Sequence, residues 1–388
     1  MRRIYLDTAS ATPTTPRAQR AFLRALEVFG NPQAPHRQGQ EAERLLSDAR
    51  THIARICSVS PEAVIFTGNA TEANNIAILG SVYKAREEGR ELKSLHVMYV
   101  EGAHASTREA VRHLASLGVR VDEIPYTKKG SVDIEYIKNH LSDQTVLVSL
   151  EQTHSETGVE VKTRDIRRVL DAGGSTAYLH VDASQSGYVS SLDRSRLGAD
   201  LLTFDAQKVG GVRGIGALVT TSRVSLTPIV FGGGQERGVR PGTPSVALAS
   251  AFAVALADAQ KDYETFRARA LRARNSMKES ICANIQHVEI NEGALQAPHI
   301  LNLSLMGRDT DYLVALLDAR GFSVSTKSAC ESDSEEGARG VYALTHDNAR
   351  ASHTLRISWN PETKERDLMA FVQALTAEVA FLDRHKLS

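Results

Sequence analysis

The chain has 388 residues, of which 42% are hydrophobic and 24% charged, and its 46 basic residues balance 46 acidic ones. A chain without net charge has no overall field to attract nucleic acid or an anionic membrane, so neither is expected as a partner. The length predicts one large domain plus a smaller one. The three cysteines, Cys57, Cys282 and Cys330, are widely spaced, which argues against disulfides or a zinc site and favours a cytoplasmic protein.

Short apolar runs alternate with segments of helical spacing over the first 220 residues. The expected strands are 3–6, 64–66, 95–100, 119–124, 145–150, 179–182, 200–204 and 216–219. The expected helices are 17–29, 42–56, 67–88, 106–117, 134–141 and 164–170. Such alternation predicts βαβ units and a mostly parallel sheet covered on both faces, which is an α/β fold. No stretch reaches the roughly 18 apolar residues that a membrane span needs.

The second half of the chain has a different pattern. A glycine-rich loop at 231–243 is followed by one long expected helix from about Pro244 past Leu271, with a change of domain inside it. The last hundred residues mix short strands and helices, as a smaller α+β unit does. We therefore expect a large domain at 16–260, and a small domain formed by 1–15 and 261–388 that carries Cys330 in a polar loop.

Two of the expected strands end near residues with opposite charges. Asp182 ends one apolar run, and Lys208 follows another by four residues. The carboxyl ends of neighbouring parallel strands open into one crevice, where an acid and an amine would suit pyridoxal 5′-phosphate (PLP). The cofactor needs a lysine for its aldehyde and a carboxylate for its pyridinium nitrogen. The alternative is a buried salt bridge, or two residues that never meet.

The segment 67–72 passes from a strand into a helix through small residues. Free backbone N–H groups at the start of a helix commonly hold a phosphate. The alternative is an ordinary helix N-cap at Asn69 or Thr71.

Taken together, these motifs resemble a known family across nearly the whole chain. In the family's order stand Tyr5-Leu6-Asp7, Ala11-Thr12-Pro13, Gly30-Asn31-Pro32 with His36, Phe66-Thr67, Ala70-Thr71-Glu72, His104, His180-Val181-Asp182-Ala183 with Gln185, Lys208, Gly232 to Gly238, Gly242-Thr243, Ser328-Ala329-Cys330 and Leu355-Arg356-Ile357-Ser358. The sequence is similar to the PLP-dependent cysteine desulfurases of the NifS/IscS kind, in class V of the fold-type I aminotransferases. The joint order of these motifs favours the interpretation of Asp182 and Lys208 as PLP-binding residues.

The resemblance implies roles for residues around the cofactor ring. Lys208 would hold the aldehyde and, once released, move a proton at the substrate Cα. Asp182 would hold the pyridinium proton. His104 would stack on the ring and take part in proton transfer, and Gln185 would donate a hydrogen bond to the phenolic oxygen.

The resemblance also implies how the phosphate is bound. Ala70 and Thr71 would bind it through a backbone N–H and a hydroxyl. Thr243 would reach the phosphate from a second subunit, so a homodimer is expected.

The implied substrate is L-cysteine, which is converted to L-alanine. Arg356 would grip its carboxylate, with Asn31 as a further substrate contact. Cys330, as a thiolate, would take the sulfur as a persulfide. An acceptor such as an iron–sulfur scaffold or a tRNA-thiolation protein would then receive it.

The chain departs from the family pattern at the phosphate and at the phenolic oxygen. Asp205-Ala206-Gln207-Lys208 replaces Ser-Gly-His-Lys. An ionised Asp205 would repel a phosphate dianion, so either Asp205 points away from the phosphate or the phosphate is held differently. Gln207 can still donate a hydrogen bond, and Thr203 is a candidate substitute donor. Ser155, or His154 before it, takes the place of the amide expected beside the phenolic oxygen.

These departures leave two other functions open. One is a related PLP enzyme, such as a selenocysteine lyase, a β-lyase or a class V aminotransferase, in which Cys330 is not essential. The other is a non-catalytic homologue that acts as a partner subunit. The remaining cysteines, Cys57 and Cys282, lie in apolar helical segments and are expected to be buried in the core.

Overall fold

The computed structural model describes residues 3–326 and 337–385. A seven-stranded sheet with the order β2-β8-β7-β6-β5-β3-β4 forms its centre. The strands are β2 (Val64–Thr67), β3 (His96–Val100), β4 (Arg120–Ile124), β5 (Thr145–Glu151), β6 (Tyr178–Asp182), β7 (Leu201–Asp205) and β8 (Gly216–Thr220). Within this sheet β8 runs antiparallel to both of its neighbours, and the other neighbouring pairs are parallel. The prediction of a mostly parallel sheet is confirmed.

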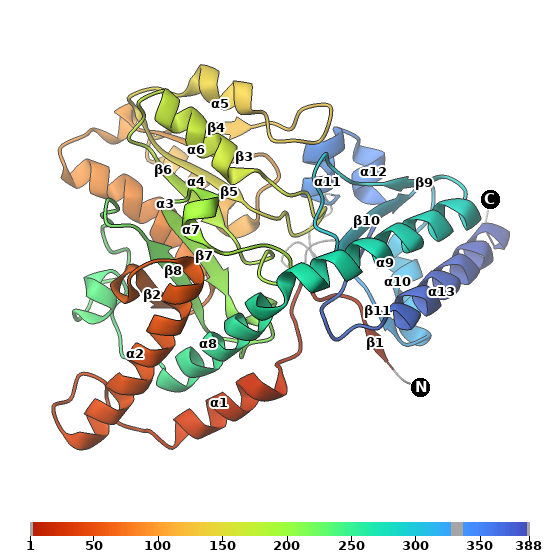
Figure 1. Ribbon diagram of the computed structural model, residues 1–388. Helices are drawn as coiled ribbons and strands as arrows, with labels where there is room; N and C mark the ends of the chain where they lie inside the picture. The colour runs from red at the N-terminus through yellow and green to blue at the C-terminus, as the bar shows by residue number, and fades with distance from the viewer. Residues whose placement is uncertain (1–2, 327–336, 386–388) are drawn as a thin grey trace.

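Helices cover both faces of this sheet (Figure 1). They are α1 (Pro16–Leu26), α2 (Arg37–Cys57), α3 (Ala70–Glu87), α4 (Ala105–Ser116), α5 (Ile134–His140), α6 (Thr163–Ala172), α7 (Arg194–Leu197) and α8 (Val246–Lys261). Side chains alternate along each strand, so neighbouring residues enter different apolar clusters. On β5, for example, Leu147 belongs to the cluster that includes α3 and α4, and Val148 to the cluster on the other face. This burial on two faces explains why the strands read as continuous apolar runs.

The C-terminal elements gather at one side of the molecule (Figure 1). They are α9 (Tyr263–Asn284), β9 (Val288–Ile290), β10 (Ile300–Leu305), α10 (Thr310–Ala319), β11 (Phe322–Ser323), α11 (Arg339–Thr345), α12 (Asn348–Ser352), β12 (Thr354–Ser358) and α13 (Glu365–Arg384). A three-stranded antiparallel sheet has the order β12-β10-β9. The N-terminal strand β1 (Ile4–Tyr5) pairs with β11, so the start of the chain joins the C-terminal elements there.

The expected long helix after Pro244 is wrong in one respect. The structure has two helices, α8 and α9, which meet at Asp262. Helix α8 packs against α1 and α2, whereas α9 packs against α13. The break at Asp262 therefore separates two helices that pack against different elements. The exact domain boundary stays a prediction.

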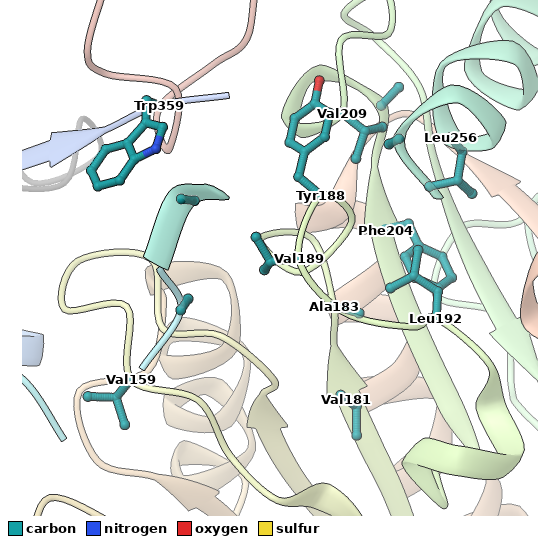
Figure 2. Packing of buried hydrophobic residues seen from close by; sticks show 14 of the residues in the cluster. Val159, Val181, Ala183, Tyr188, Val189, Leu192, Phe204, Val209, Leu256 and Trp359 are labelled. Atoms are coloured by element: carbon teal, nitrogen blue, oxygen red, sulfur yellow. The ribbon is translucent and has the colours of Figure 1, made fainter. Parts of the chain in front are cut away.

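The alternation of side chains along β6 and β7 creates the floor of the site. Figure 2 shows Val181 and Ala183 on the core side of β6, with Phe204 packed near Leu256 of α8. Asp182 lies between Val181 and Ala183 and therefore points to the opposite face. Asp182 pairs with Thr203 of β7, and Thr203 lies two residues before Asp205. Asp182 and Asp205 therefore lie on the same face of the sheet.

The two cysteines within the described residues differ in exposure. Cys57 is buried, as predicted, and burial raises the pKa of its thiol. Cys282 is exposed, so its predicted burial is wrong. It lies on α9, whose buried face is formed by other residues, including Met277 and Ile281. In the described ranges, no helix combines the length and apolar character needed to span a membrane.

Candidate active site

A cavity of about 290 Å³ opens where β6 and β7 end. Its lining comes from segments far apart in the chain: Ala9, Ser10, Ala70, Thr71, His104, Ser106, Glu151, Thr153, Ser155, Asp182, Ser184, Gln185, Asp205, Gln207, Lys208 and Arg356. Larger cavities of about 540 and 740 Å³ lie elsewhere, but neither is lined by Asp182 or Lys208. The predicted acid and amine therefore share one cavity.

Asp182 is held as a hydrogen-bond acceptor at the end of β6. Its Oδ2 accepts from Asn74 Nδ2 at 2.8 Å, and its Oδ1 accepts from the Ser184 backbone N–H at 2.9 Å. The residue is 8% exposed. Donors of this kind stabilise an ionised carboxylate and fix its direction.

Lys208 lies against the N-terminal segment of the chain. Its Nζ donates to the carbonyl oxygens of Ala9 at 2.7 Å and Ser10 at 2.6 Å. Gln185 Nε2 donates to the same Ala9 oxygen at 2.8 Å. Residues 9 and 10 thus position both the amine and the amide at the cavity.

His104 is the N-cap of α4, and its ring also lines the cavity. Its Nδ1 accepts from the Ser106 backbone N–H at 3.1 Å and lies 2.8 Å from Ser106 Oγ. The backbone donor assigns the proton of the neutral ring to Nε2. The His104 backbone N–H donates at 2.6 Å to Glu151 at the end of β5, which fixes the start of the helix.

Strand β12 places the side chain of Arg356 at the same cavity. Its Nη2 donates to Asp7 Oδ1 and Ser10 Oγ, each at 2.7 Å, and its Nη1 donates to the Ser155 carbonyl at 3.1 Å. The residue is 2% exposed, and its Nε has no hydrogen-bond partner within the described part of the chain. This guanidinium is rigidly placed and can bind a carboxylate that enters the cavity.

The start of α3 is where the sequence predicts a phosphate site. Ala70 and Thr71 both line the cavity, as does Gln207. Asp205 does not point away, however: its Oδ2 accepts from the Ala70 N–H at 3.1 Å and its Oδ1 from the Gln207 N–H at 3.0 Å. Of the two expectations for Asp205, the one in which it points away from this site is therefore wrong.

The structure does not bring every predicted residue to the cavity. Thr203 is fully buried outside the cavity, and its Oγ1 lies 3.0 Å from His180 Nε2. It is therefore not a substitute phosphate donor. Asn31 is exposed, and its side chain accepts from Gln33 N–H in a turn. Thr243 is exposed and lies outside the cavity, and its role toward a second subunit stays a prediction. Cys330 lies outside the described residues.

The flanks of the segment that contains Cys330 lie close to the cavity wall. Before it, Ser325 pairs with Arg356, whose N–H donates to the Ser325 carbonyl at 2.7 Å. After it, the Gly340 N–H donates to Glu156 Oε2 at 2.7 Å, and Glu156 follows the cavity residue Ser155.

His154 itself turns away from the cavity. Its Nε2 lies 2.9 Å from the Gly102 carbonyl, and its Nδ1 accepts from the Glu156 N–H at 3.2 Å. Ser155, which does line the cavity, therefore remains the candidate at this position.

Several cavity or support residues were not predicted, among them Asn74, Ser106, Glu151 and Ser184. Asn74 Nδ2 donates to both Asp182 and Ser106 Oγ, the latter at 2.9 Å, and thereby links Asp182 to His104 through Ser106. Asn74 is fully buried inside a helix. A polar residue within the apolar helical spacing of 73–85 is the sequence signal that could have identified it.

Comparison with known proteins places this geometry in a family. The family model described as Aminotransferase class-V matches residues 4–371. The mitosomal cysteine desulfurase of Encephalitozoon cuniculi is 33% identical over 380 residues, covering 95% of this chain and 85% of that protein. Cysteine desulfurase IscS of Rickettsia bellii is 31% identical over 381 residues, covering 97% and 91%.

The chain belongs to the class-V aminotransferase family. The predicted resemblance to the cysteine desulfurases of the NifS/IscS kind is confirmed. A solved NifS-like protein superposes with a TM-score of 0.90 at 25% identity, covering 98% of this chain and all of that one. The predicted fold type I is therefore confirmed as well.

Members of this family use PLP, and the described residues fit the ring end of that cofactor. Asp182 offers a fixed carboxylate, and Lys208 offers an amine in the same cavity. The Ser184 hydroxyl is buried at the cavity and has no partner among the described residues, as expected of a group that a ligand satisfies. Where the sequence predicts the phosphate, the Ala70 N–H already donates to Asp205.

Proposed function

We infer that this protein is a PLP-dependent cysteine desulfurase, which converts L-cysteine to L-alanine and transfers the sulfur to Cys330. The observation that carries this inference is the meeting of Asp182, Lys208 and Arg356 in one cavity. These residues come from β6, from the turn after β7 and from β12, so only the complete fold assembles them. The family match over residues 4–371 supports the same conclusion.

Each of these residues has a distinct part in the reaction. When bound, PLP supplies an electron sink that weakens the bonds around the substrate Cα. Asp182 would hold the proton of the ring nitrogen, and Lys208 would bind the aldehyde and later move the Cα proton as a neutral amine. His104, with its proton on Nε2, is a second group able to exchange a proton in the cavity.

Substrate recognition and sulfur transfer involve Arg356 and Cys330. Arg356 would bind the substrate carboxylate, and its contacts with Asp7 and Ser155 keep it in place for this. The Cys330 thiolate would attack the substrate sulfur. A new S–S bond would form while the C–S bond breaks and leaves its electron pair on the Cβ of the substrate. That carbon would then take up a proton, and the fragment would be released as L-alanine.

The test is incubation of the PLP-loaded enzyme with L-cysteine, followed by alkylation and mass spectrometry. We expect alanine to form and a persulfide to appear on Cys330. Cys330→Ser should abolish both, whereas Cys282→Ser, which changes the exposed thiol of α9, should preserve both. Unchanged alanine formation in Cys330→Ser would instead favour a lyase or another class V enzyme.

We further propose a homodimer. Thr243 is exposed, and the preceding loop carries Val230 and Phe231 at 51% and 84% exposure. Phe29, 83% exposed, lies in a neighbouring loop that is joined to the first by a hydrogen bond from Gln235 to Gln33. A second copy would cover these apolar residues. Light scattering should give twice the mass of the chain, and Phe231→Asp should reduce it to the monomer mass.

The sulfur acceptor is proposed only by class, as a protein with its own thiol or cluster-assembly site. The cytoplasmic location stays a prediction.

A further inference from the structure

The carboxylate of Asp205 lies at the N-terminus of α3, inside the candidate active site. It accepts hydrogen bonds from two backbone N–H groups, those of Ala70 at 3.1 Å and Gln207 at 3.0 Å. The residue is only 6% exposed and lines the same cavity as Lys208. An acceptor of this kind satisfies the donors that a helix N-terminus would otherwise offer to a bound anion.

Two other backbone N–H groups around the start of α3 also have protein acceptors. The Glu72 N–H donates to Asn69 Oδ1 at 2.9 Å, and the Gly68 N–H donates to Glu72 Oε2. Arg240 pairs with Glu72 at 2.9 Å. The positive end of the helix therefore already faces two carboxylates, those of Asp205 and Glu72, before any ligand arrives.

The backbone holds Asp205 close to this turn. A Cβ atom on Gly216 would lie 3.0 Å from the Ala70 nitrogen and 2.6 Å from the Phe204 carbonyl oxygen. The glycine thus allows the start of α3 to approach the end of β7, where Asp205 stands. A phosphate that bonded to the Ala70 N–H would have to take the place of the Asp205 oxygen.

We propose that Asp205 is an internal anion that occupies the position of the cofactor phosphate, and that PLP binds only when this carboxylate leaves the Ala70 N–H or takes up a proton. The proposal rests on the proposed function, since it assumes PLP as the cofactor. It assigns Asp205 as the residue that sets how strongly the site favours PLP over pyridoxal, which has the same aldehyde and ring but no phosphate. The carboxylate repels a phosphate dianion and leaves the ring end of the site unchanged.

The surroundings of Asp205 allow its carboxylate either to take up a proton or to leave the Ala70 N–H. Burial raises the pKa of its carboxyl group, while the hydrogen bonds from Ala70 and Gln207 and the charge of Lys208 act in the opposite direction, and Asp182 raises it further. Protonation of Asp205 would remove the charge repulsion and weaken its hydrogen bond with the Ala70 N–H, so that the side chain can give way to the phosphate. Rotation of the side chain would instead free the Ala70 N–H for the phosphate.

The experiment compares the cofactor-free protein with Asp205→Asn and Asp205→Ser. Dissociation constants for PLP and for pyridoxal are measured by titration of the visible absorbance of the bound aldehyde. We expect both variants to bind PLP roughly tenfold or more tightly than the unmodified chain, with pyridoxal affinity changed by less than about twofold. Asp309→Asn is the matched control, because Asp309 is the N-cap of α10 and lies outside the cavity.

The ratio of the two dissociation constants is the deciding quantity, since a general loss of stability affects both ligands alike. The proposal would be overturned if the Asp205 variants preferred PLP over pyridoxal no more strongly than the unmodified chain does. The control should keep the ratio of the unmodified chain.

A second measurement separates this proposal from the proposed function. Melting temperatures of the cofactor-free proteins are recorded with and without inorganic phosphate. We expect phosphate to raise the melting temperature of Asp205→Ser but not of the unmodified chain or Asp309→Asn. If neither aldehyde binds to any variant, the proposed function fails, while this phosphate response still decides the role of Asp205. An equal response in all proteins would count against it.

Discussion

The side-chain amide of Asn74 donates a 2.8 Å hydrogen bond to Asp182 Oδ2 and a 2.9 Å hydrogen bond to Ser106 Oγ. The Ser106 hydroxyl in turn lies 2.8 Å from His104 Nδ1. One buried amide on α3 therefore fixes the acid of β6 and, through Ser106, the histidine at the start of α4. These contacts tie Asp182 and His104, two residues of the same cavity, to one side chain of α3.

Replacement of Asn74 by Ala should weaken both contacts. Loss of a donor to a buried carboxylate costs about 1–3 kcal/mol, so the free energy of unfolding should fall by that amount. PLP affinity should also fall, because Asp182 loses its fixed direction. Chemical denaturation and PLP titration measure the two effects. Asn75→Ala is the control, since the Asn75 amide donates to the Thr71 carbonyl of its own helix.

Replacement of Arg356 by Lys should impair substrate binding. A lysine keeps the charge but cannot bond Asp7, Ser10 and a substrate carboxylate with one planar group. We expect kcat/KM for L-cysteine to fall roughly 10- to 100-fold, with most of the change in KM. Arg168→Lys, on the surface of α6, should leave the kinetics unchanged. An unaltered KM in Arg356→Lys would remove Arg356 from substrate binding.

Replacement of Gly216 by Ala should disturb the contact between β8 and α3. The new methyl group would lie 2.6 Å from the Phe204 carbonyl oxygen, which belongs to the backbone and cannot rotate away. Forced shifts of this kind cost about 1–3 kcal/mol of unfolding free energy. Gly234→Ala serves as the comparison, because its added Cβ would meet no atom within 4 Å. Equal stability of the two variants in thermal unfolding would contradict the expected clash.

Stability should fall in mild acid because of His299. Burial, with a smaller effect of Arg267, lowers the pKa of this imidazole from 6.5 to about 3 in the folded chain. Below about pH 6.5 the unfolded chain therefore binds a proton that the folded chain does not, and the free energy of unfolding decreases until about pH 3. Between pH 7 and pH 5 this histidine contributes a loss of about 2 kcal/mol.

His299→Gln should reduce that pH dependence by a similar amount, as measured by urea unfolding at pH 7 and pH 5. His52→Gln, at an exposed position on α2, should follow the unmodified chain. Parallel pH profiles for His299→Gln and the unmodified chain would show that His299 titrates normally.

Much of the architecture follows from the sequence because its signals are local. Continuous apolar runs such as Val97 to Val100 predict strands with two buried faces. The change from strand to helix after Thr67 predicts the start of α3 within a few residues. The order of the family motifs along the chain also indicated the shared cavity of Asp182 and Lys208. The period of two along β6 then sends Asp182 to the face opposite Val181.

The tertiary structure decided what no local pattern contains. Asn74 and Asp182 are 108 residues apart and meet only because α3 packs over the carboxyl end of β6. The sequence left open whether Asp205 points away from the phosphate or the phosphate is held differently. In the fold, α3 comes close to Gly216, and the Asp205 carboxylate accepts a hydrogen bond from the Ala70 N–H. Sequence spacing predicts which residues share a strand or a helix face, but the distance between two elements depends on the packing of all the others.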